Sequence, residues 1–592
     1  MLKMSVCLVA VAAAGWSAEC PRPAGAPRAL KPAGSTQAVT QRIGREPAGR
    51  PVQAATGTID RRLFEAMEQA GVQPARICTD EEYLRRSTLD LTGRIPKRAR
   101  VEAFLADQRP DKRERLVDEL LATPEWADKW TMFFGDLFRN SVNPGRQRAT
   151  QERASLNGWV RAALKAGKPY DEMARELITA KGESSFDDGR VGFLSWAGLA
   201  IQLDQDRIDL HTVHVADTFL GLSHMDCLLC HNGRGRLDDI SLWGRQTTRR
   251  QAWGFSAFFG KTTMGLVGGQ VDGRPRQAPW FLRDDPDKAG YQLGTTEGDR
   301  PARGGSGVVA PRYLNDKAPA EGEDYREFLA RQVTADPQFA RAAVNYIWRE
   351  FFVLGMVEPA NQFDLARLDP DNPPPPPWTL QPTNARLLRD LAADFASAKF
   401  DLKSLMRQIT TSQAYQLSSG YDGEWKPEYE PLFARKYVRR LWAEEIHDAI
   451  AQSSGVPSSY IAMQLQGGPS AAGPGGMIPG GFAPADPVAE FLDAFLRGNR
   501  VDQLRSGDFN LEQALRLMNN PFVLDRIQVT PERLRLTDSE LVDELFLSVL
   551  GRRPADTERA SSLALLTAGD RAGQASHLLW SLFNKADFIY NY

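Results

Sequence analysis

The sequence predicts a mainly α-helical protein made of two helical domains that are joined by an irregular Gly/Pro-rich linker. Apolar residues recur every three or four positions from Thr58 to about 262, and again from 324 to Tyr592. Between 263 and 323 this periodicity lapses, and Gly, Asp, Pro and Arg accumulate. The length of 592 residues fits more than one domain of ordinary size. We therefore expect helical domains at 58–262 and 324–592, with a linker or small insert between them.

The N-terminus has the pattern of an export signal. Lys3 supplies a positive charge, residues 6–15 are apolar or small, and Ala13, Gly15 and Ser17 offer a cleavage site. We predict a signal peptide at residues 1–18. The mature protein is then expected in the periplasm or cell envelope.

Residues 19–57 follow as a flexible tether. This stretch is rich in Pro, Ala, Gly and Arg and has few large apolar residues, so it cannot offset the entropy lost on ordering. Cys20 could carry a lipid anchor. Glu19 disfavours this alternative, because small residues are expected before a lipidated cysteine.

The first helical domain opens with clear helix signals. Ile59, Leu63 and Met67 recur at helical spacing and form one apolar face. Thr79 and Glu82 have the spacing of a capping box, in which each side chain satisfies a first-turn amide. A second helix is therefore predicted to begin at this point.

Large apolar side chains continue the pattern in both halves. Trp126, Trp130 and Phe134 form an aromatic stripe that is most simply explained by core packing. In the second half, Val344 and Trp348 repeat the same spacing. These stripes support two helical cores.

Composition excludes several classes of partner. Lys and Arg number 73 against 75 Asp and Glu, so the net charge of −2 provides no field that would attract nucleic acid. No apolar run after the N-terminus approaches the ~20 residues that a membrane helix needs, so no transmembrane segment is expected in the mature chain. Five cysteines in 592 residues do not make a disulfide scaffold, and Cys78 is interpreted as a buried thiol.

One motif carries chemistry. Cys227, Cys230 and His231 form CxxCH, the attachment signature of c-type haem. Two cysteines three positions apart lie on one face of a helical turn, where both thiols can bond the vinyl groups of one porphyrin. The histidine that follows is placed to act as the proximal iron ligand. The sequence predicts one covalently attached haem c, and an exported protein is a suitable host for it.

Two other interpretations of the motif stay open. Cys227 and Cys230 could form a disulfide in an oxidising compartment. They could also contribute to a zinc site, although no second CxxC, CxxH or HxxxH pair completes it; His211 and His214 would then have to be recruited.

The sixth iron ligand is not determined by the sequence. Met264 is a candidate because it lies downstream of the motif and methionine raises the haem potential. His211 and His214 precede the motif and would form a bis-histidine site instead. An open sixth position is a further alternative, and it would permit binding of an external ligand.

With the motif identified, the chain resembles the planctomycete-type secreted proteins that join a cytochrome-like PSCyt domain to a PSD domain. The resemblance rests on stretches distributed over both halves: residues 85–96, 111–121, 218–222, 227–232, 253–259, 343–348, 401–406, 517–522 and 582–588. It implies an exported c-type haem protein in which Cys227, Cys230 and His231 hold the haem. Members often continue the motif as His-Asp-His-Pro, whereas Gly233 stands here at the position of the second histidine.

These observations lead to one functional hypothesis and two alternatives. We expect an electron-transfer or redox role in the cell envelope, with other envelope redox or polysaccharide-processing proteins as partners. The first alternative is a peroxidase-like haem enzyme with an open distal site. The second is a haem-free envelope scaffold or binding protein linked to polysaccharide breakdown, in which the cysteines form a disulfide. The sequence does not decide whether the protein is an enzyme, and it identifies no catalytic residue.

Overall fold

The computed structural model describes residues 49–140, 150–195, 204–267, 278–294, 298, 300–458, 462–464, 487–497, 505–507 and 510–592. The expected signal peptide, Cys20 and the tether up to residue 48 lie outside these residues. The described part is mostly helical, which confirms the predicted fold class. No helix within it is both long and apolar enough to cross a membrane.

The first helical region extends from Thr58 to Phe259. Its elements are α2 (Thr58–Gln69), α3 (Asp80–Thr92), α4 (Arg98–Ala106), α5 (Lys112–Leu121), α6 (Pro124–Leu137), α7 (Thr150–Lys165), α8 (Tyr170–Ile178), α9 (Val191–Ser195), α10 (Asp204–Leu220), α11 (Met225–Cys230), α12 (Leu242–Gln246), α13 (Arg249–Ser256) and the 3₁₀ turn η2 (Ala257–Phe259).

A short strand-containing segment follows, where the sequence predicted a linker or small insert. Strand β1 (Thr262–Leu266) pairs antiparallel with β2 (Trp280–Asp284), and β3 (Tyr291–Gln292) pairs antiparallel with β4 (Val308–Val309). These strands are too short for the alternation of apolar and polar residues to reveal them in the sequence.

Helices return with α14 and continue to the C-terminus. The elements are α14 (Tyr325–Ala335), α15 (Pro337–Phe352), η3 (Leu365–Arg367), α16 (Ala385–Ser397), α17 (Leu402–Thr411), η4 (Pro427–Leu432), β5 (Arg439–Arg440), α18 (Ala443–Ser454), η5 (Ala462–Gln464), α19 (Pro487–Ala494), α20 (Leu511–Asn519), α21 (Pro521–Leu524), α22 (Pro531–Leu534), α23 (Asp538–Leu550), α24 (Asp556–Thr567), α25 (Arg571–Phe583), α26 (Ala586–Ile589) and β6 (Tyr590–Asn591).

The helix signals predicted from the sequence have the expected local structure. Helix α3 begins at the predicted capping box, in which the Thr79 side chain accepts from the Glu82 amide and the Glu82 carboxylate accepts from the Thr79 amide. Ile59, Leu63 and Met67 are all buried on the inner face of α2. Local capping and one apolar stripe therefore suffice to place these helices.

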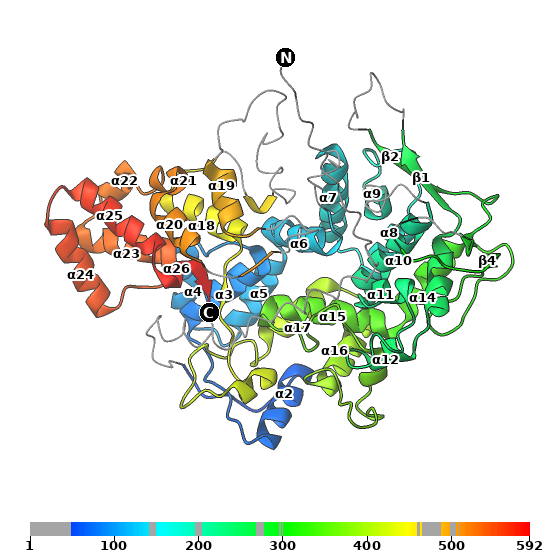
Figure 1. Cartoon of the computed structure of the whole chain (residues 1–592). Coiled ribbons are helices and arrows are strands. Elements are labelled where there is room, and N and C mark those ends of the chain that lie inside the picture. Colours follow the sequence, from blue (N-terminus) through cyan, green and yellow to red (C-terminus); the bar gives the residue numbers. More distant parts are fainter. Residues whose placement is uncertain are drawn as a thin grey trace, which may run out of the picture.

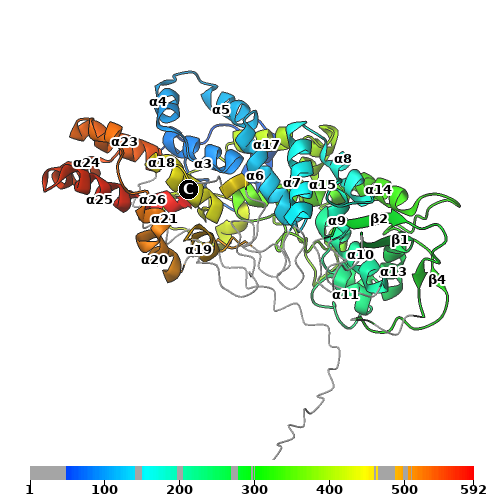
Figure 2. The ribbon, with the colours of Figure 1, turned by 90° about the horizontal axis from the view of Figure 1, so that it is seen from above.

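The two helical regions pack against each other. Figures 1 and 2 show α23–α25 at one end of the molecule and β1, β2 and α13 at the other. Between these ends, α2 packs on α16, α5 on α17, and α10 on α15, so one hydrophobic core contains residues from both regions. A second core joins Leu89 of α3 to the C-terminal helices. The domain limits stay a prediction, but the regions share their interior.

A buried cluster of charges also joins the two regions. Asp90 of α3 accepts hydrogen bonds from the Tyr415 hydroxyl (2.8 Å) and from the Asn591 amide (2.7 Å). Its carboxylate lies 2.9 Å from Arg439 and 3.5 Å from Lys436. Burial alone would raise the pKa of Asp90, but the neighbouring cations lower it to about 2. The first region is therefore held to the C-terminal strand by an ionised carboxylate with several partners.

Candidate functional site

The CxxCH motif lies on helix α11. This helix packs on α10 and α13, far from the C-terminal helices (Figures 1 and 2). Leu228 and Leu229 are fully buried, whereas Cys227, Cys230 and His231 are half-buried. The two leucines fix α11 on the core, and the helical spacing turns both thiols toward the partly open side.

The thiols of Cys227 and Cys230 do not form a disulfide. Burial, followed by the charge of Asp226, raises the pKa of Cys227. Cys230 Sγ lies 3.2 Å from the Arg300 guanidinium, which donates a hydrogen bond to it. The two thiols therefore have different electrostatic surroundings although they lie on one helical face.

His231 is oriented by its own backbone. Its Nδ1 lies 2.9 Å from the carbonyl oxygen of Asn232. Because a carbonyl can only accept, Nδ1 donates in this contact, and in the neutral form of the ring Nε2 then keeps its lone pair. No hydrogen bond to Nε2 is formed by the described residues. A histidine that ligates a metal commonly has this arrangement, with the other ring nitrogen bonded to a carbonyl.

Arg300, from the segment after β3, lies against the motif helix. Its guanidinium donates to the Asp226 carboxylate at 2.5 Å and to the Asp226 carbonyl at 3.2 Å. It also lies 3.5 Å from the carboxylate of Asp209 on α10. One side chain thus links α10 and α11 to a segment about 70 residues further along the chain.

Arg303 continues this network into the interior. Its guanidinium contacts Asp209 at 2.6 Å and Asp206 at 3.0 Å, and it donates to the Tyr291 hydroxyl at 2.9 Å. Arg303 and both aspartates are at most 1% exposed. The acidic face of α10 is therefore neutralised by the segment that the sequence suggested as a linker.

Arg249 also joins the segment that carries Arg300 and Arg303 to α11. Its guanidinium donates to the Leu229 carbonyl (2.9 Å), the Ala302 carbonyl (2.9 Å) and the Pro301 carbonyl (2.5 Å). The Arg249 backbone amide donates to the Asn232 side chain at 2.8 Å. Arg249 therefore holds both the end of α11 and the loop after His231.

Gly233 lies directly against another backbone. Its amide donates to the Thr247 carbonyl at 3.0 Å, and a Cβ at this position would lie 1.6 Å from the Gly244 carbonyl oxygen. No side chain fits at this position between the two loops, so the second histidine of a His-Asp-His-Pro motif could not stand here without a shift of the backbone.

Two protein-family models match the chain. PSCyt2, described as a protein of unknown function (DUF1549), covers residues 58–263, and PSD1, described as a protein of unknown function (DUF1553), covers residues 325–566. The chain therefore contains a PSCyt2 domain followed by a PSD1 domain. The order of the two domains confirms the resemblance noted in the sequence. No curated protein and no solved structure matches the chain.

The PSCyt2 domain contains all three motif residues, and two of the candidate sixth ligands lie on α10, which packs on the motif helix α11. His211 and His214 are buried on α10, where the His214 ring lies 4.2 Å from the Phe193 ring of α9 and the His211 ring 5.4 Å from Phe259. Burial lowers the pKa of His211 to about 3. Both imidazoles therefore belong to the packing between α10 and its aromatic neighbours.

Met264 lies just beyond the PSCyt2 domain. It is buried in β1, opposite Leu282 of β2, and the main partner of β1 is this hairpin strand. Helix α11 packs chiefly on α10 and α13 instead. The sequence alone did not indicate this placement of Met264, because it depends on the chain forming the β1–β2 hairpin after α13.

No group of three or more His, Cys, Asp or Glu side chains within the described ranges is arranged to hold a metal ion. The motif residues themselves fit a covalent haem. Neither thiol is in a disulfide, both thiols share one helical turn, and His231 uses Nδ1 and not Nε2 for its contact with the Asn232 carbonyl. The fit rests on these three side chains and on no further metal ligand.

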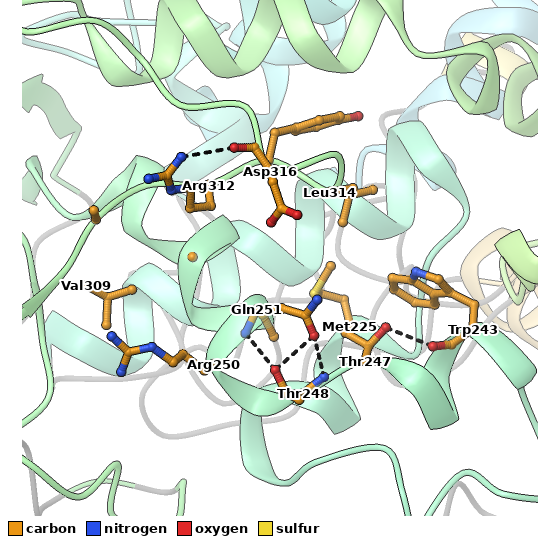
Figure 3. Close-up of a pocket in the computed structure, with 14 residues that line it drawn as sticks. Met225, Trp243, Thr247, Thr248, Arg250, Gln251, Val309, Arg312, Leu314 and Asp316 are labelled. Atoms are coloured by element: carbon orange, nitrogen blue, oxygen red, sulfur yellow. Dashed lines mark hydrogen bonds between the residues drawn. The ribbon is translucent and has the colours of Figure 1, made fainter.

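A pocket of about 390 Å³ adjoins the motif helix. Met225 of α11 contributes to its wall, and the other sides come from α12, α13 and the segment 309–316 (Figure 3). Sequence reasoning did not find this pocket, because its walls come from the PSCyt2 domain and from a segment outside both family matches. Their juxtaposition depends on the packing of the segment after β4.

Proposed function

We propose that this protein is an exported c-type haem protein of the cell envelope that transfers electrons. The observation that carries the proposal is the orientation of His231. Its Nδ1–H is bonded to the Asn232 carbonyl, so Nε2 is left as the atom that can coordinate iron. The thiols of Cys227 and Cys230 do not form a disulfide, which supports covalent attachment of haem.

Each motif residue has a distinct role in this proposal. Cys227 and Cys230 would form the two thioether links, and Leu228 and Leu229 anchor the helix that holds them. His231 would be the proximal ligand. When bound, the haem supplies reversible one-electron chemistry. The partly open position of the motif favours exchange of electrons with another protein in the envelope.

A haem enzyme with an open distal site is a second candidate. It is supported by the contacts of His211, His214 and Met264, because the partners of these side chains are Phe259, Phe193 and the strand β2. Carbon monoxide distinguishes the two candidates. Reduced haem that does not bind carbon monoxide would support electron transfer, and rapid binding of carbon monoxide would support the enzyme.

The pyridine haemochrome spectrum tests covalent attachment. The full chain is produced together with a c-type maturation system, and its spectrum is compared with those of Cys227→Ala, Cys230→Ala and the double variant. Each single change should remove one thioether link and the double change all covalent haem. Cys78→Ala is the matched control, because Cys78 is a buried thiol on another part of the chain. Wild-type protein without covalent haem would refute the proposal.

Export and partners belong to the same proposal. N-terminal sequencing of mature protein should begin after Ser17 or Ala18, and an intact Met1 would contradict export. We expect other envelope redox or polysaccharide-processing proteins as partners, and no nucleic acid, because the net charge is only −2.

A further inference from the structure

The pocket beside α11 takes no part in the proposed haem attachment. None of Cys227, Cys230 and His231 lines it, so its chemistry can be considered separately. Its volume of about 390 Å³ is at the lower end of the range found for small-molecule sites. An occupant would therefore be about the size of one substituted ring.

One end of the pocket is cationic. Arg250 and Arg312 lie at the end marked by Val309 (Figure 3). Neither guanidinium forms an ion pair with any residue in the part of the chain that the structure describes. Arg312 donates instead to the Asp316 backbone carbonyl at 3.1 Å. Two arginines without acidic partners at one end of a pocket favour an anionic group there, and guanidinium groups match a carboxylate in particular.

The middle of the pocket offers an acceptor and a donor. The carboxylate of Asp316 and the amide of Gln251 both point into it (Figure 3). Gln251 Oε1 accepts from the Thr248 amide at 2.8 Å, which leaves Nε2 as a donor. A ligand hydroxyl, which both donates and accepts, is complementary to this pair.

The opposite end is apolar. Met225, Trp243 and Leu314 line it (Figure 3). A flat hydrophobic face packs well against an aromatic ring and the neighbouring aliphatic groups. The ligand should therefore carry a ring between its anionic group and this wall.

We propose that the pocket binds a small ring-containing carboxylate with hydroxyl groups. The carboxylate would pair with Arg250 and Arg312, the hydroxyl groups with Asp316 and Gln251, and the ring face with Trp243. A sugar acid and a hydroxylated aromatic acid share this chemistry. Because Met225 is two positions before Cys227, the bound molecule lies beside the motif helix. Binding itself goes beyond the proposed haem function and does not require it.

Isothermal titration calorimetry of the full chain tests the proposal. The probes are glucuronate and 3,4-dihydroxybenzoate, with glucose as a ring without charge and inorganic phosphate as an anion without a ring. We expect at least one carboxylate to bind and both comparison probes to bind at least about tenfold more weakly, because each lacks one part of the recognition. Glucuronate alone would identify a sugar acid, and dihydroxybenzoate alone an aromatic acid.

Variants distinguish this pocket from other binding. Arg250→Gln with Arg312→Gln should lose about tenfold or more in affinity, since both charge-assisted contacts disappear. Arg234→Gln with Arg236→Gln is the matched control, because these arginines are exposed and do not line the pocket. Asp316→Asn should weaken binding more than Asp239→Asn. Circular dichroism checks that each variant is folded.

Three results would overturn the proposal. They are the absence of heat from both carboxylates at millimolar concentration, glucose binding as tightly as glucuronate, and unchanged affinity in the Arg250 and Arg312 double variant. The titration is repeated with the Cys227→Ala, Cys230→Ala protein, which cannot hold covalent haem. Retained binding there separates the pocket from the proposed haem function.

Discussion

Replacing Gly233 by alanine should destabilise the loop that follows the CxxCH motif. The added Cβ would lie 1.6 Å from the Gly244 carbonyl oxygen, whereas ordinary contacts begin at 3.4 Å, so one of the two backbones must move by about 1.8 Å. Overpacking of this kind costs about 1–3 kcal/mol. The shift also weakens the 3.0 Å hydrogen bond to Thr247, which adds about 1 kcal/mol. The expected loss is about 2–4 kcal/mol of unfolding free energy.

Urea denaturation followed by circular dichroism measures this loss. Gly158→Ala is the matched control, because Gly158 lies inside helix α7 and a Cβ there meets no atom within 4 Å. Alanine is the better helix former, so the control should gain about 1 kcal/mol. The two glycine-to-alanine changes are therefore predicted to act in opposite directions.

The reasoning is refuted if Gly233→Ala is as stable as the wild type, or if both variants shift in the same direction. A second readout is the yield of covalent haem after maturation. Gly233 is two positions after His231, so its displacement should lower that yield, whereas Gly158→Ala should leave it unchanged.

The remaining predictions concern the charge cluster and the iron. Asp90→Ala should cost about 3–5 kcal/mol in urea denaturation, because it leaves Lys436 buried without its carboxylate and Arg439 with Glu445 as its remaining one. The control Asp118→Ala removes only the exposed pair with Arg407 and should cost at most about 1 kcal/mol; equal losses would count against a structural role of the cluster. The pKa values of Asp90 and Glu445 are each lowered to about 2 from 3.8 and 4.5, as neighbouring cations outweigh burial. The stabilisation that these two carboxylates provide is therefore present above pH 4.5 and is lost as the pH falls toward 2. Denaturation midpoints measured at several pH values test this. A midpoint that stays constant from pH 5 to pH 2.5 would contradict it. Met264→Ala should leave the absorption spectrum of the haem-containing protein unchanged, since Met264 packs in the β1–β2 hairpin. Conversion from a six-coordinate to a five-coordinate spectrum would instead identify Met264 as the sixth ligand.

Helix positions could be predicted from the sequence where the signal is local. The Thr79 capping box and the apolar face of α2 need only neighbours within four residues, and both have the predicted structure. The aromatic stripe of α6 is likewise buried at Trp126 and Trp130. The placement of Cys227 and Cys230 on one helical turn could likewise be predicted from their spacing.

The surroundings of the motif could not be predicted in the same way. Arg300 contacts Cys230 across 70 positions, and the bonds of Arg303 to Asp206 and Asp209 span 97 and 94 positions. Arginines and aspartates are frequent throughout the chain, so no sequence pattern selects these pairs. The sixth-ligand candidates show the same difficulty: the histidines of α10 face aromatic side chains, and this depends on how α9 packs.

The network around Arg303 also bears on how this protein is divided for expression. A recombinant piece that ends at residue 263, where the PSCyt2 match stops, would lack Arg300 and Arg303. Asp206 and Asp209 on α10 would then lose their ion pairs with Arg303, and Asp209 would also lose the one with Arg300. Such a piece should be poorly soluble or should loosen around α10 and α11, even though it contains the whole motif. The physical unit that supports CxxCH therefore extends at least to Arg303, about 40 residues beyond the limit that sequence similarity assigns.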